Sequence, residues 1–359
     1  GKNHDDASHN RSEGVALGVL QHAHTDLDSA VSRLTVAQMA AKALNLRPSR
    51  NETPFGDVDN GYVTVLYEKI QLSGELEEDG TLSYHPEDSI TRSELVAIIW
   101  RMKNTDVHAG QIAYEGYSQT FYLDVLETVP AFSYIPQLFR MEGDYLTYDD
   151  GTVQGHLGVD VSQFQGEIDW DAVADDNIDF AMVRVGFRGT GTGSLNTDKY
   201  YEQNIRGAMR AGLETGVYFF AQAVTVEEAI EEADYVISLL DGLDINGPVA
   251  YDWEMHDSTY RVYGTSPEMA TACAVAFCQR IKDAGYTPMV YGGTYVTYMK
   301  YDQGALADYL SWYPEYKSEK SEKLCPTLVY HMDYWQFSSS RAVAGINGRV
   351  DMNIQFIRR

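Results

Sequence analysis

From about residue 155 onward, short apolar segments alternate along the chain with longer amphipathic ones. The apolar segments have the length of strands, and the amphipathic ones have the period of helices. This alternation predicts βα units around a parallel sheet. The expected strands are Leu157–Val161, Phe180–Gly186, Gly216–Ala221, Val249–Glu254, Pro288–Gly292, Leu310–Tyr313, His331–Gln336 and Val350–Phe356, and the expected helices are Asp169–Asp176, Asp198–Ala211, Val226–Leu240 and Pro267–Ala284.

The order of these elements predicts an α/β fold. Helices lie mainly between the first five strands, and the connections become shorter after Gly292. Two helices have clear start signals, because Thr225-x-x-Glu228 is a capping box and Ser266 stands before Pro267. We therefore expect an irregular TIM-like (β/α)5(β)3 barrel over residues 155–359.

The chain before residue 150 contains a degenerate repeat. Leu34–Leu46 and Ile90–Met102 each begin with an apolar residue and Thr, and each continues as an amphipathic helix. Phe55-Gly-Asp57-Val58 matches Tyr122-Leu-Asp124-Val125 in the same way. Helix-like segments follow these motifs at Val63–Leu72 and Phe132–Met141.

Such a repeat predicts stacked helix pairs that bury their faces on one another. Residues 25–150 are therefore expected to form a smaller helix-rich repeat domain, joined to the barrel near Asp149–Gly155. The polar residues 1–24 are expected to be a mobile leader.

Part of the repeat resembles the S-layer homology repeat, which anchors proteins to cell-wall polymers. The resemblance rests on Phe55-x-Asp57-Val58, Asp79-Gly80 through Pro86, and Ile90-Thr91-Arg92-Ser93-Glu94. It implies a secondary cell-wall polymer as a partner of this region. Thr91-x-x-Glu94 is equally a capping box, which needs no ligand. An anchor, a simple spacer and a lid over the barrel all remain open.

Composition excludes several classes of function. Asp and Glu number 53 against 27 Lys and Arg, which gives a formal net charge of −26. This chain lacks the basic surplus of a general nucleic-acid binder, and anionic membranes are disfavoured for the same reason. Three cysteines are too few for a disulfide scaffold. No Cys/His cluster has zinc spacing. We expect no metal and no organic cofactor, because the two carboxylates considered next need only water for their chemistry.

The segment Pro248-Val-Ala-Tyr-Asp252-Trp-Glu254 ends an apolar strand with two carboxylates. Positions i and i+2 on a strand face the same side, about 6.6 Å apart along the backbone. Barrel enzymes place catalysis at this end of their strands. Paired carboxylates push their pKa values apart, so one can serve as an acid while the other stays ionised. Glycoside cleavage needs this combination.

Two further acids are expected nearby. Asp160 ends the first expected barrel strand, and Asp351 lies in the last one. The first and last strands of a closed barrel are neighbours. Asp160, Asp252, Glu254 and Asp351 are therefore predicted to meet on one face.

Residues 155–359 resemble glycoside hydrolase family 25, the bacterial and phage N-acetylmuramidases. The resemblance implies hydrolysis of the β-1,4 bond between N-acetylmuramic acid and N-acetylglucosamine in peptidoglycan glycan strands, with retention, by a secreted, cell-wall-associated lysozyme. The matching residues are Gly158-x-Asp160-x-Ser162, Ile168-Asp-Trp170, Phe180-Ala, Arg184, Asp198, Asn204, Gly212, Gly216-x-Tyr218, Asp252-x-Glu254, Tyr291, Trp312, Tyr316, Tyr334-Trp335-Gln336-Phe337-Ser338 and Gly345-Ile-x-Gly348-x-Val-Asp351-x-Asn353.

The resemblance also implies roles for the acids. By position, Glu254 resembles the general acid/base and Asp252 its partner, which either attacks the anomeric carbon or orients the substrate's N-acetyl oxygen. Asp160 and Asp351 resemble the two further acids of the site. The candidate substrate-binding residues are Tyr218, Tyr291, Trp312, Trp335 and Arg184.

Two details of this region are specific to the chain. Trp335 and Gln336 are adjacent on an alternating strand, so only one of them can point inward. The insert His256–Thr265, which contains Tyr260 and Tyr263, is expected to form a loop beside the acids that tunes substrate length.

Two other functions remain open at this point. The same fold would suit another N-acetylhexosamine polymer, such as a chitin-like chain. A non-catalytic wall-binding or surface protein could use the barrel as a sugar-binding module. The four acids argue against the second alternative, because a decayed site would be free to lose carboxylates.

Overall fold

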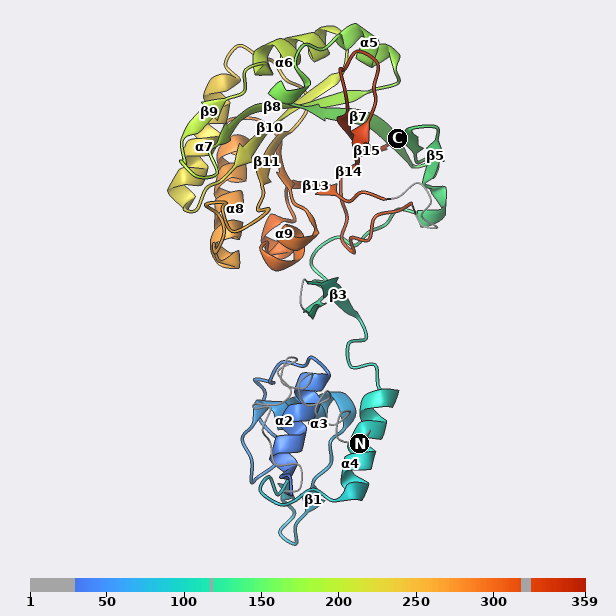
Figure 1. The fold of residues 1–359 in the computed structure, drawn as a ribbon, viewed down its shortest axis with the longest axis vertical. Coiled ribbons are helices and arrows are strands. Elements are labelled where there is room, and N and C mark those ends of the chain that lie inside the picture. Colours follow the sequence, from blue (N-terminus) through green and yellow to red (C-terminus); the bar gives the residue numbers. More distant parts are fainter. Residues whose placement is uncertain (1–29, 117–118, 318–323) are drawn as a thin grey trace, which may run out of the picture. The chain divides into compact units, whose positions relative to one another are not determined.

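A computed structural model describes residues 30–116, 119–317 and 324–359. The leader expected at residues 1–24 lies outside these ranges. The chain divides into two compact units between Val125 and Leu126 (Figure 1). This division falls earlier than the boundary expected near Asp149–Gly155, because residues 126–148 pack on the second unit.

The first unit contains three helices, α2 (Arg33–Ala43), α3 (Gly61–Ile70) and α4 (Arg92–Asn104), in its described residues. Each begins where a polar side chain caps free backbone amides: Ser32, Asn60 and Thr91 accept hydrogen bonds from the first turns of their helices. These helices match the ones expected at Leu34–Leu46, Val63–Leu72 and Ile90–Met102. Short hairpins join β1 (Glu75–Leu76) to β2 (Leu82–Ser83) and β3 (Gln111–Glu115) to β4 (Thr120–Asp124).

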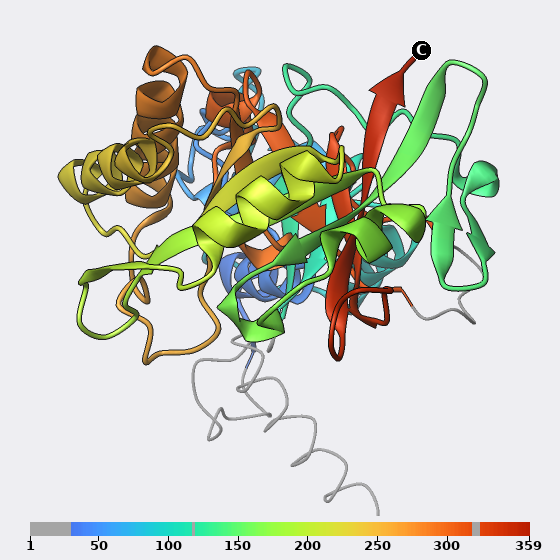
Figure 2. The same ribbon diagram turned by 90° about the horizontal axis from the view of Figure 1, so that it is seen from above.

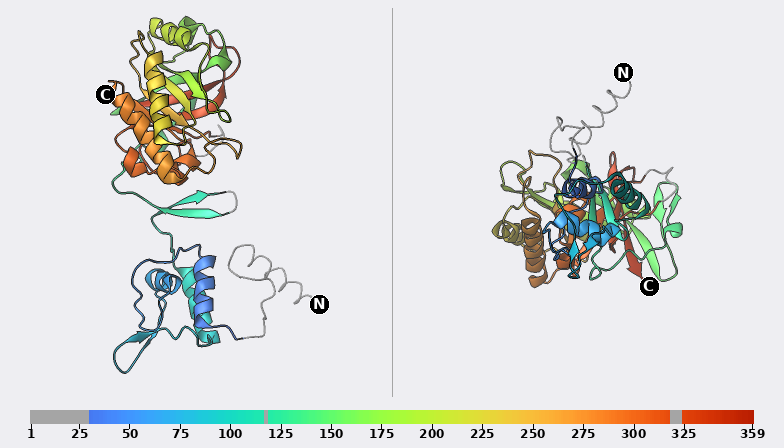
Figure 3. Two further views of the ribbon diagram at one scale, coloured as in Figure 1. Left: turned by 90° about the vertical axis from the view of Figure 1, so that its left-hand side faces the viewer. Right: turned by 90° about the horizontal axis from the view of Figure 1, so that it is seen from below.

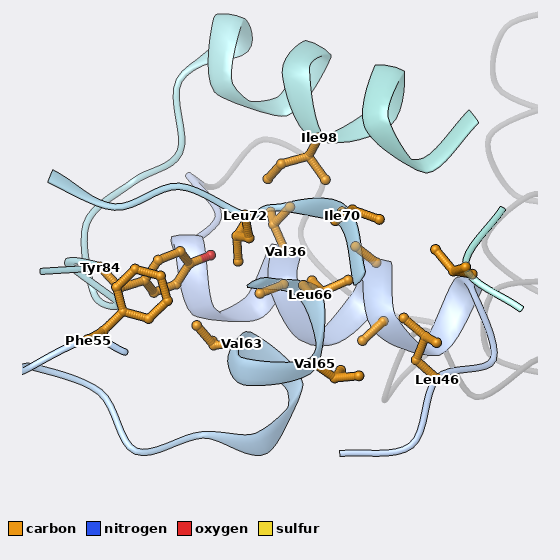
Figure 4. Packing of buried hydrophobic residues seen from close by; sticks show 14 residues of the cluster. Val36, Leu46, Phe55, Val63, Val65, Leu66, Ile70, Leu72, Tyr84 and Ile98 are labelled. Carbon is orange, nitrogen blue, oxygen red and sulfur yellow. The ribbon is translucent and has the colours of Figure 1, made fainter. Parts of the chain in front are cut away.

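The core of this unit lies between α2 and α3. Figure 4 shows Val36, Leu66 and Ile70 packed together, with the rings of Phe55 and Tyr84 at one end. Helix α4 covers this core with Ile98, its one buried side chain. Val96 and Trp100 of α4 are each 64 % exposed.

The second half of the expected repeat does not form a helix pair. Tyr122–Asp124 belongs to β4, and Phe132–Met141 contains only a single turn of 3₁₀ helix, Pro136–Leu138, followed by β5 (Arg140–Glu142). The expectation of a helix here was wrong for a tertiary reason. The aromatic side chains of this segment pack on the barrel, which fixes the backbone in an irregular path.

Three aromatic residues hold the chain between Phe132 and Tyr148 in place. Tyr134 stacks on Phe356 with ring centroids 4.0 Å apart, and its hydroxyl donates to the carbonyl of Met332 at 2.6 Å. Phe139 packs edge-on against Trp335, and Tyr148 packs edge-on against Phe356. The chain then passes through β6 (Tyr145–Thr147) into the first barrel strand.

The second unit is a mixed α/β fold around a closed barrel of eight strands. The barrel closes because β8 pairs with both β7 and β10. All neighbours run parallel except the last strand, which is antiparallel to β14 and β7; Figure 2 shows β7 and β15 side by side. The strands are β7 (Val153–Val161), β8 (Phe180–Arg188), β10 (Glu214–Ala221), β11 (Val249–Trp253), β12 (Pro288–Tyr291), β13 (Leu310–Pro314), β14 (Tyr334–Arg341) and β15 (Val350–Arg358).

Helices cover the outside of the barrel between the early strands (Figure 1). Helices α7 and α8 lie side by side (Figure 3). The sequence did not predict the strand β9 (Leu195–Thr197), which pairs with the end of β8, or the two short helices that follow β12. The helices of this unit are α5 (Trp170–Asp175), α6 (Tyr201–Arg210), α7 (Val226–Leu239), α8 (Pro267–Asp283), α9 (Thr294–Met299) and α10 (Gln303–Leu306).

The barrel interior is filled by side chains rather than left as a pore. Phe180, Met182 and Met289 form a buried cluster with Trp312 and Tyr334. These apolar side chains form the floor beneath the polar residues at the carboxyl ends of the strands. No helix in the described part of the chain is long and apolar enough to cross a membrane.

Candidate active site

The four acids singled out from the sequence lie at one end of the barrel. Asp160 near the end of β7 is directly opposite Asp351 at the start of the antiparallel β15. Asp252 is the penultimate residue of β11, and Glu254 follows that strand by one residue. Their mutual electrostatic influence links all four carboxyl groups across the barrel mouth.

Asp160 is buried and is held by two neutral donors. The side-chain amides of Gln336 and Asn353 each donate to its Oδ2 atom at 2.8 Å. Burial raises the pKa of Asp160, and the charge of Asp351 raises it further, while the two amides lower it. Burial also raises the pKa of Asp351, which shares a hydrogen bond with Asp160. The two groups therefore form a carboxyl pair suited to sharing a proton.

Asp252 and Glu254 form a second carboxyl pair. Asp252 is buried, and burial raises its pKa well above the usual range. The charge of Glu254 and a hydrogen bond with it act in the same direction. Asp252 Oδ1 has no hydrogen-bond partner among the described residues. One oxygen of Asp252 is thus buried without a hydrogen-bond donor.

Glu254 is the more accessible member of this pair, with 24 % of its side chain exposed. Its main-chain carbonyl accepts a hydrogen bond of 2.7 Å from Gln222 Nε2. Its carboxylate lies 2.7 Å from Nε2 of His256. The sequence predicts that His256 lies in a loop beside the acids. This contact could not be predicted, because a strand pattern does not show how the loop returns toward Glu254.

Three of the predicted substrate-binding rings line the barrel interior. Trp312 meets Tyr291 and Tyr218 edge-on, at 4.9 and 5.9 Å between ring centroids. The Tyr291 hydroxyl donates to Gln336 Oε1 at 3.2 Å. Trp312 is buried, and its Nε1 donates to Asn353 Oδ1 at 2.8 Å, so it supports the site from below.

Trp335 does not lie in this group. It is 1 % exposed, packs on Phe139 and Phe337, and donates from Nε1 to the carbonyl of Glu315 at 2.9 Å. Its neighbour Gln336 points inward instead. The substrate-binding role predicted for Trp335 was therefore wrong, because the strand alternation places the ring on the outer face of β14.

Arg184 is tied to a buried acid at the same end of the barrel. Its Nε and Nη2 atoms both lie 2.9 Å from Asp198 Oδ2. Its guanidinium also lies over the rings of Phe164 and Phe187, at 5.1 and 5.4 Å from their centroids. Phe164 is 79 % exposed, so Arg184 lies under a ring that faces solvent.

A family model of the glycosyl hydrolases family 25 matches residues 159–346, which include the carboxyl ends of all the barrel strands before β15. The chain belongs to glycosyl hydrolase family 25. The match covers more than half of the chain and spans Asp160, Asp252 and Glu254.

Curated relatives of this family 25 chain include two bacterial lysozymes. The "Autolytic lysozyme" of Clostridium acetobutylicum is 25 % identical over 197 residues, which cover 55 % of this chain and 54 % of that protein. "Lysozyme M1" of Streptomyces globisporus is 26 % identical over 215 residues, covering 58 % and 71 %. The matched region thus spans about half the length of the clostridial relative.

Solved structures similar to the family 25 unit include the spore cortex lytic enzyme SleM of Clostridium perfringens and a lysozyme from Streptomyces coelicolor. The first has a TM-score of 0.48 and 21 % identity, covering 56 % of this chain and 67 % of that one. The second has a TM-score of 0.45 and 25 % identity, covering 57 % and 92 %.

Proposed function

We propose that this family 25 chain is a retaining lysozyme that hydrolyses the β-1,4 bond between N-acetylmuramic acid and N-acetylglucosamine in peptidoglycan. The observation that carries the proposal is the meeting of two hydrogen-bonded carboxyl pairs at the mouth of the barrel. We interpret the order of its elements as a (β/α)5(β)3 barrel. Glycoside cleavage needs one group that donates a proton and one that stabilises positive charge at the anomeric carbon.

Glu254 is the general acid in this proposal. It is the member of its pair that reaches solvent, so a glycosidic oxygen lying across the barrel mouth could approach it. Its proton passes to the leaving oxygen as the C–O bond breaks, and the electron pair of that bond stays on the oxygen. Glu254 then takes a proton from the water that completes hydrolysis.

Asp252 is better placed to orient the substrate than to attack it. Its carboxyl group is within hydrogen-bonding range of Glu254. Pairs that attack the sugar directly have carboxyl groups about 5–5.5 Å apart. The unpartnered Asp252 Oδ1 could accept the N–H of a substrate N-acetyl group, whose carbonyl oxygen would then attack the anomeric carbon. This arrangement supports the substrate-assisted alternative.

Asp160 and Asp351 complete the electrostatic environment in this proposal. A proton shared by this pair limits the negative charge that Asp252 and Glu254 experience. Tyr218 and Tyr291 would contact sugar faces at the mouth. Trp312 would hold Asn353, and through it Asp160, in place.

Digestion of purified peptidoglycan tests the proposal. Fragments are reduced with borohydride and analysed by mass spectrometry, and reduced muramic acid ends are the expected product. Glu254→Gln should abolish their release while leaving the circular dichroism spectrum unchanged. Glu227→Gln, at an exposed position of α7, is the matched control and should retain full activity.

Other outcomes of the digestion identify the alternatives. Reduced glucosamine ends would mean that the same site cuts the other glycosidic bond. Faster cleavage of a chitin oligomer than of peptidoglycan would indicate a different N-acetylhexosamine polymer. Retention on walls without new reducing ends would contradict hydrolysis and favour a binding module.

We further propose that the protein is secreted and that its first unit contacts a secondary cell-wall polymer. Arg92 at the start of α4 is exposed and follows the capping Thr91, so its guanidinium is available to an anionic polymer. Sedimentation of the full chain with whole walls tests this. Arg92→Gln should weaken binding, whereas unchanged binding would favour a spacer.

A further inference from the structure

The loop between β11 and α8 is fastened to the rest of the barrel. Arg261 donates from Nη2 to Glu228 Oε1 at 2.7 Å and from Nη1 to the Gln222 carbonyl at 3.0 Å. Its main-chain amide donates to the Thr190 carbonyl at 2.8 Å, and Val262 is fully buried. The loop therefore has a defined position, although it lies at the mouth of the barrel.

His256, near the start of this loop, lies over the carboxylate of Glu254. Its Nε2 atom is 2.7 Å from Glu254 Oε2, and its ring meets Tyr260 edge-on at 5.3 Å between centroids. The His256 side chain is 64 % exposed. His256 therefore contacts Glu254 from the solvent side, while Asp252 contacts it from inside the barrel.

The groups that face His256 are acidic. Glu254 and Asp257 on its own loop raise its pKa, with the hydrogen bond to Glu254 as the main cause, and partial burial opposes them. Asp257 is itself held by Thr259, whose amide donates to it at 2.7 Å. Beyond Glu254 lie the carboxyl groups of Asp252 on β11, Asp160 on β7 and Asp351 on β15.

We propose that His256 is a positioning residue that stores the catalytic proton for Glu254. This inference rests on the proposed function, in which Glu254 is the general acid. In the resting enzyme the two side chains together hold one proton, which lies on His256 while the mouth is open to water. When a glycan covers the mouth, the proton moves from Nε2 of His256 to Glu254.

The protons taken up and released by the pair balance over one turnover. Glu254 gives the proton to the leaving oxygen, which leaves a neutral imidazole beside a carboxylate. The carboxylate then removes a proton from the attacking water, and that proton returns the pair to its resting state. His256 changes neither the bonds broken nor the products. His256 sets the highest pH at which the pair still holds the proton that the reaction needs.

The proposal predicts a specific change in pH dependence. The alkaline limb of the pH profile of kcat/KM reports the loss of the last proton from the pair. The pKa of this step belongs to both groups together. Without an imidazole, Glu254 must hold this proton alone. The alkaline limb of His256→Gln should therefore move down by about one pH unit, a roughly tenfold loss at neutral pH and above. Activity near pH 5 should change by less than about twofold.

The experiment uses the full chain and soluble peptidoglycan fragments, with kcat/KM measured from pH 4 to pH 9. His256→Gln retains a hydrogen-bond donor but does not titrate. His156→Gln is the matched control. His156, in the first half of β7, also lies near a carboxylate, that of Asp179. Its profile should superimpose on that of the unmodified protein. A superimposable His256→Gln profile would overturn the proposal and leave His256 a purely structural contact.

An NMR titration gives a readout that does not depend on turnover. The His256 ring resonance is identified by its loss in His256→Gln, and it should titrate above the ordinary histidine pKa of about 6.5. In Glu254→Gln it should titrate at lower pH. An unchanged titration in Glu254→Gln would mean that the pair is absent in solution and would overturn the proposal.

These measurements separate the two levels of inference. If the unmodified protein releases no reducing ends, or Glu254→Gln remains active, the proposed function is contradicted, and so is the role of His256 that depends on it. If the enzyme is active, Glu254→Gln is inactive and the His256→Gln profile is unshifted, only the role of His256 is contradicted.

Discussion

Asp160 on β7 accepts a hydrogen bond of 2.8 Å from the side-chain amide of Gln336 on β14. Strand β15 lies between these two strands and supplies Asn353, whose amide donates to the same oxygen. The carboxylate is thus held by the adjacent strand β15 and by β14, the strand beyond it. Burial in this position opposes its charge, while the amides stabilise it.

Replacement of Asn353 should destabilise the barrel. Asn353→Leu removes one donor from Asp160 and leaves the Nε1 atom of Trp312 without its acceptor. Buried polar groups that lose their partner cost about 1–3 kcal/mol each, so the free energy of unfolding, measured in urea, should fall by roughly 2–6 kcal/mol. Combining it with Trp312→Phe should restore part of that loss, and a fully additive double variant would contradict the coupling.

Asp160→Asn should lower activity and raise stability. The folded-state pKa of Asp160 is raised, so its contribution to stability is present below its unfolded pKa and is lost as the pH rises through the raised value. Asparagine mimics the protonated acid and can still donate to Asp351. At pH 8, the free energy of unfolding of Asp160→Asn, measured in urea, should exceed that of the unmodified protein by about 1.4 kcal/mol for each unit by which folding raises the pKa of Asp160. Its turnover should be reduced. Lower stability at pH 8 would contradict this.

Loss of Arg188 should leave a buried charge. Arg188 donates from Nε to Glu232 Oε1 at 2.7 Å, and Glu232 is completely buried. Breaking such a pair costs about 3–5 kcal/mol. Burial raises the pKa of Glu232 to about 7 even with Arg188 present. Stability from this group is therefore lost as the pH rises through 7, so Arg188→Met should be more destabilised at pH 8 than at pH 5.

The double variant Arg188→Met/Glu232→Leu is the control for this prediction. Removal of both charges should recover much of the stability and abolish the added pH dependence. Equal destabilisation of Arg188→Met at the two pH values would show that Glu232 does not become charged in the folded protein. Urea unfolding followed by tryptophan fluorescence measures both quantities.

The division between Val125 and Leu126 can be tested by fragment stability. A fragment Leu126–Arg359 should unfold cooperatively, at the same temperature as the barrel in the full chain. A fragment that starts at Gly155 lacks Tyr134, Phe139 and Tyr148, and exposes the faces of Phe356 and Trp335 on which they pack. Since loss of one buried aromatic side chain costs about 3–5 kcal/mol, this shorter fragment should unfold at a much lower temperature. Equal melting temperatures would instead support the later boundary.

The barrel could be predicted in outline because its signals are local. Each strand is a short apolar segment, and the main helices begin at caps such as Thr225 and Ser266, which the structure retains. The convergence of Asp160 and Asp351 followed from the neighbouring positions of the first and last strands. Strand β9 is short and polar, and therefore carried no such signal.

Other features depend on contacts that no local pattern contains. The Phe132–Met141 segment has helix-like spacing, but its rings pack on β14 and β15. Alternation on β14 allowed either Trp335 or Gln336 inside, and the partners of Gln336 decided between them. His256 contacts Glu254 from a loop that Arg261 fastens to the distant residues Gln222 and Glu228.

The antiparallel pairing of β7 and β15 places the end of β15 away from the acids at the barrel mouth. Val153 lies opposite Arg358 at one end of this pair, and Asp160 lies opposite Asp351 at the other. A rise of about 3.3 Å per residue places the two ends roughly 20 Å apart. A protein fused after Arg359 would leave the barrel on the side away from the acids, so a tether to a bead or a second module should not obstruct a polymeric substrate. The same proximity of Val153 and Arg358 makes the barrel a good subject for circular permutation.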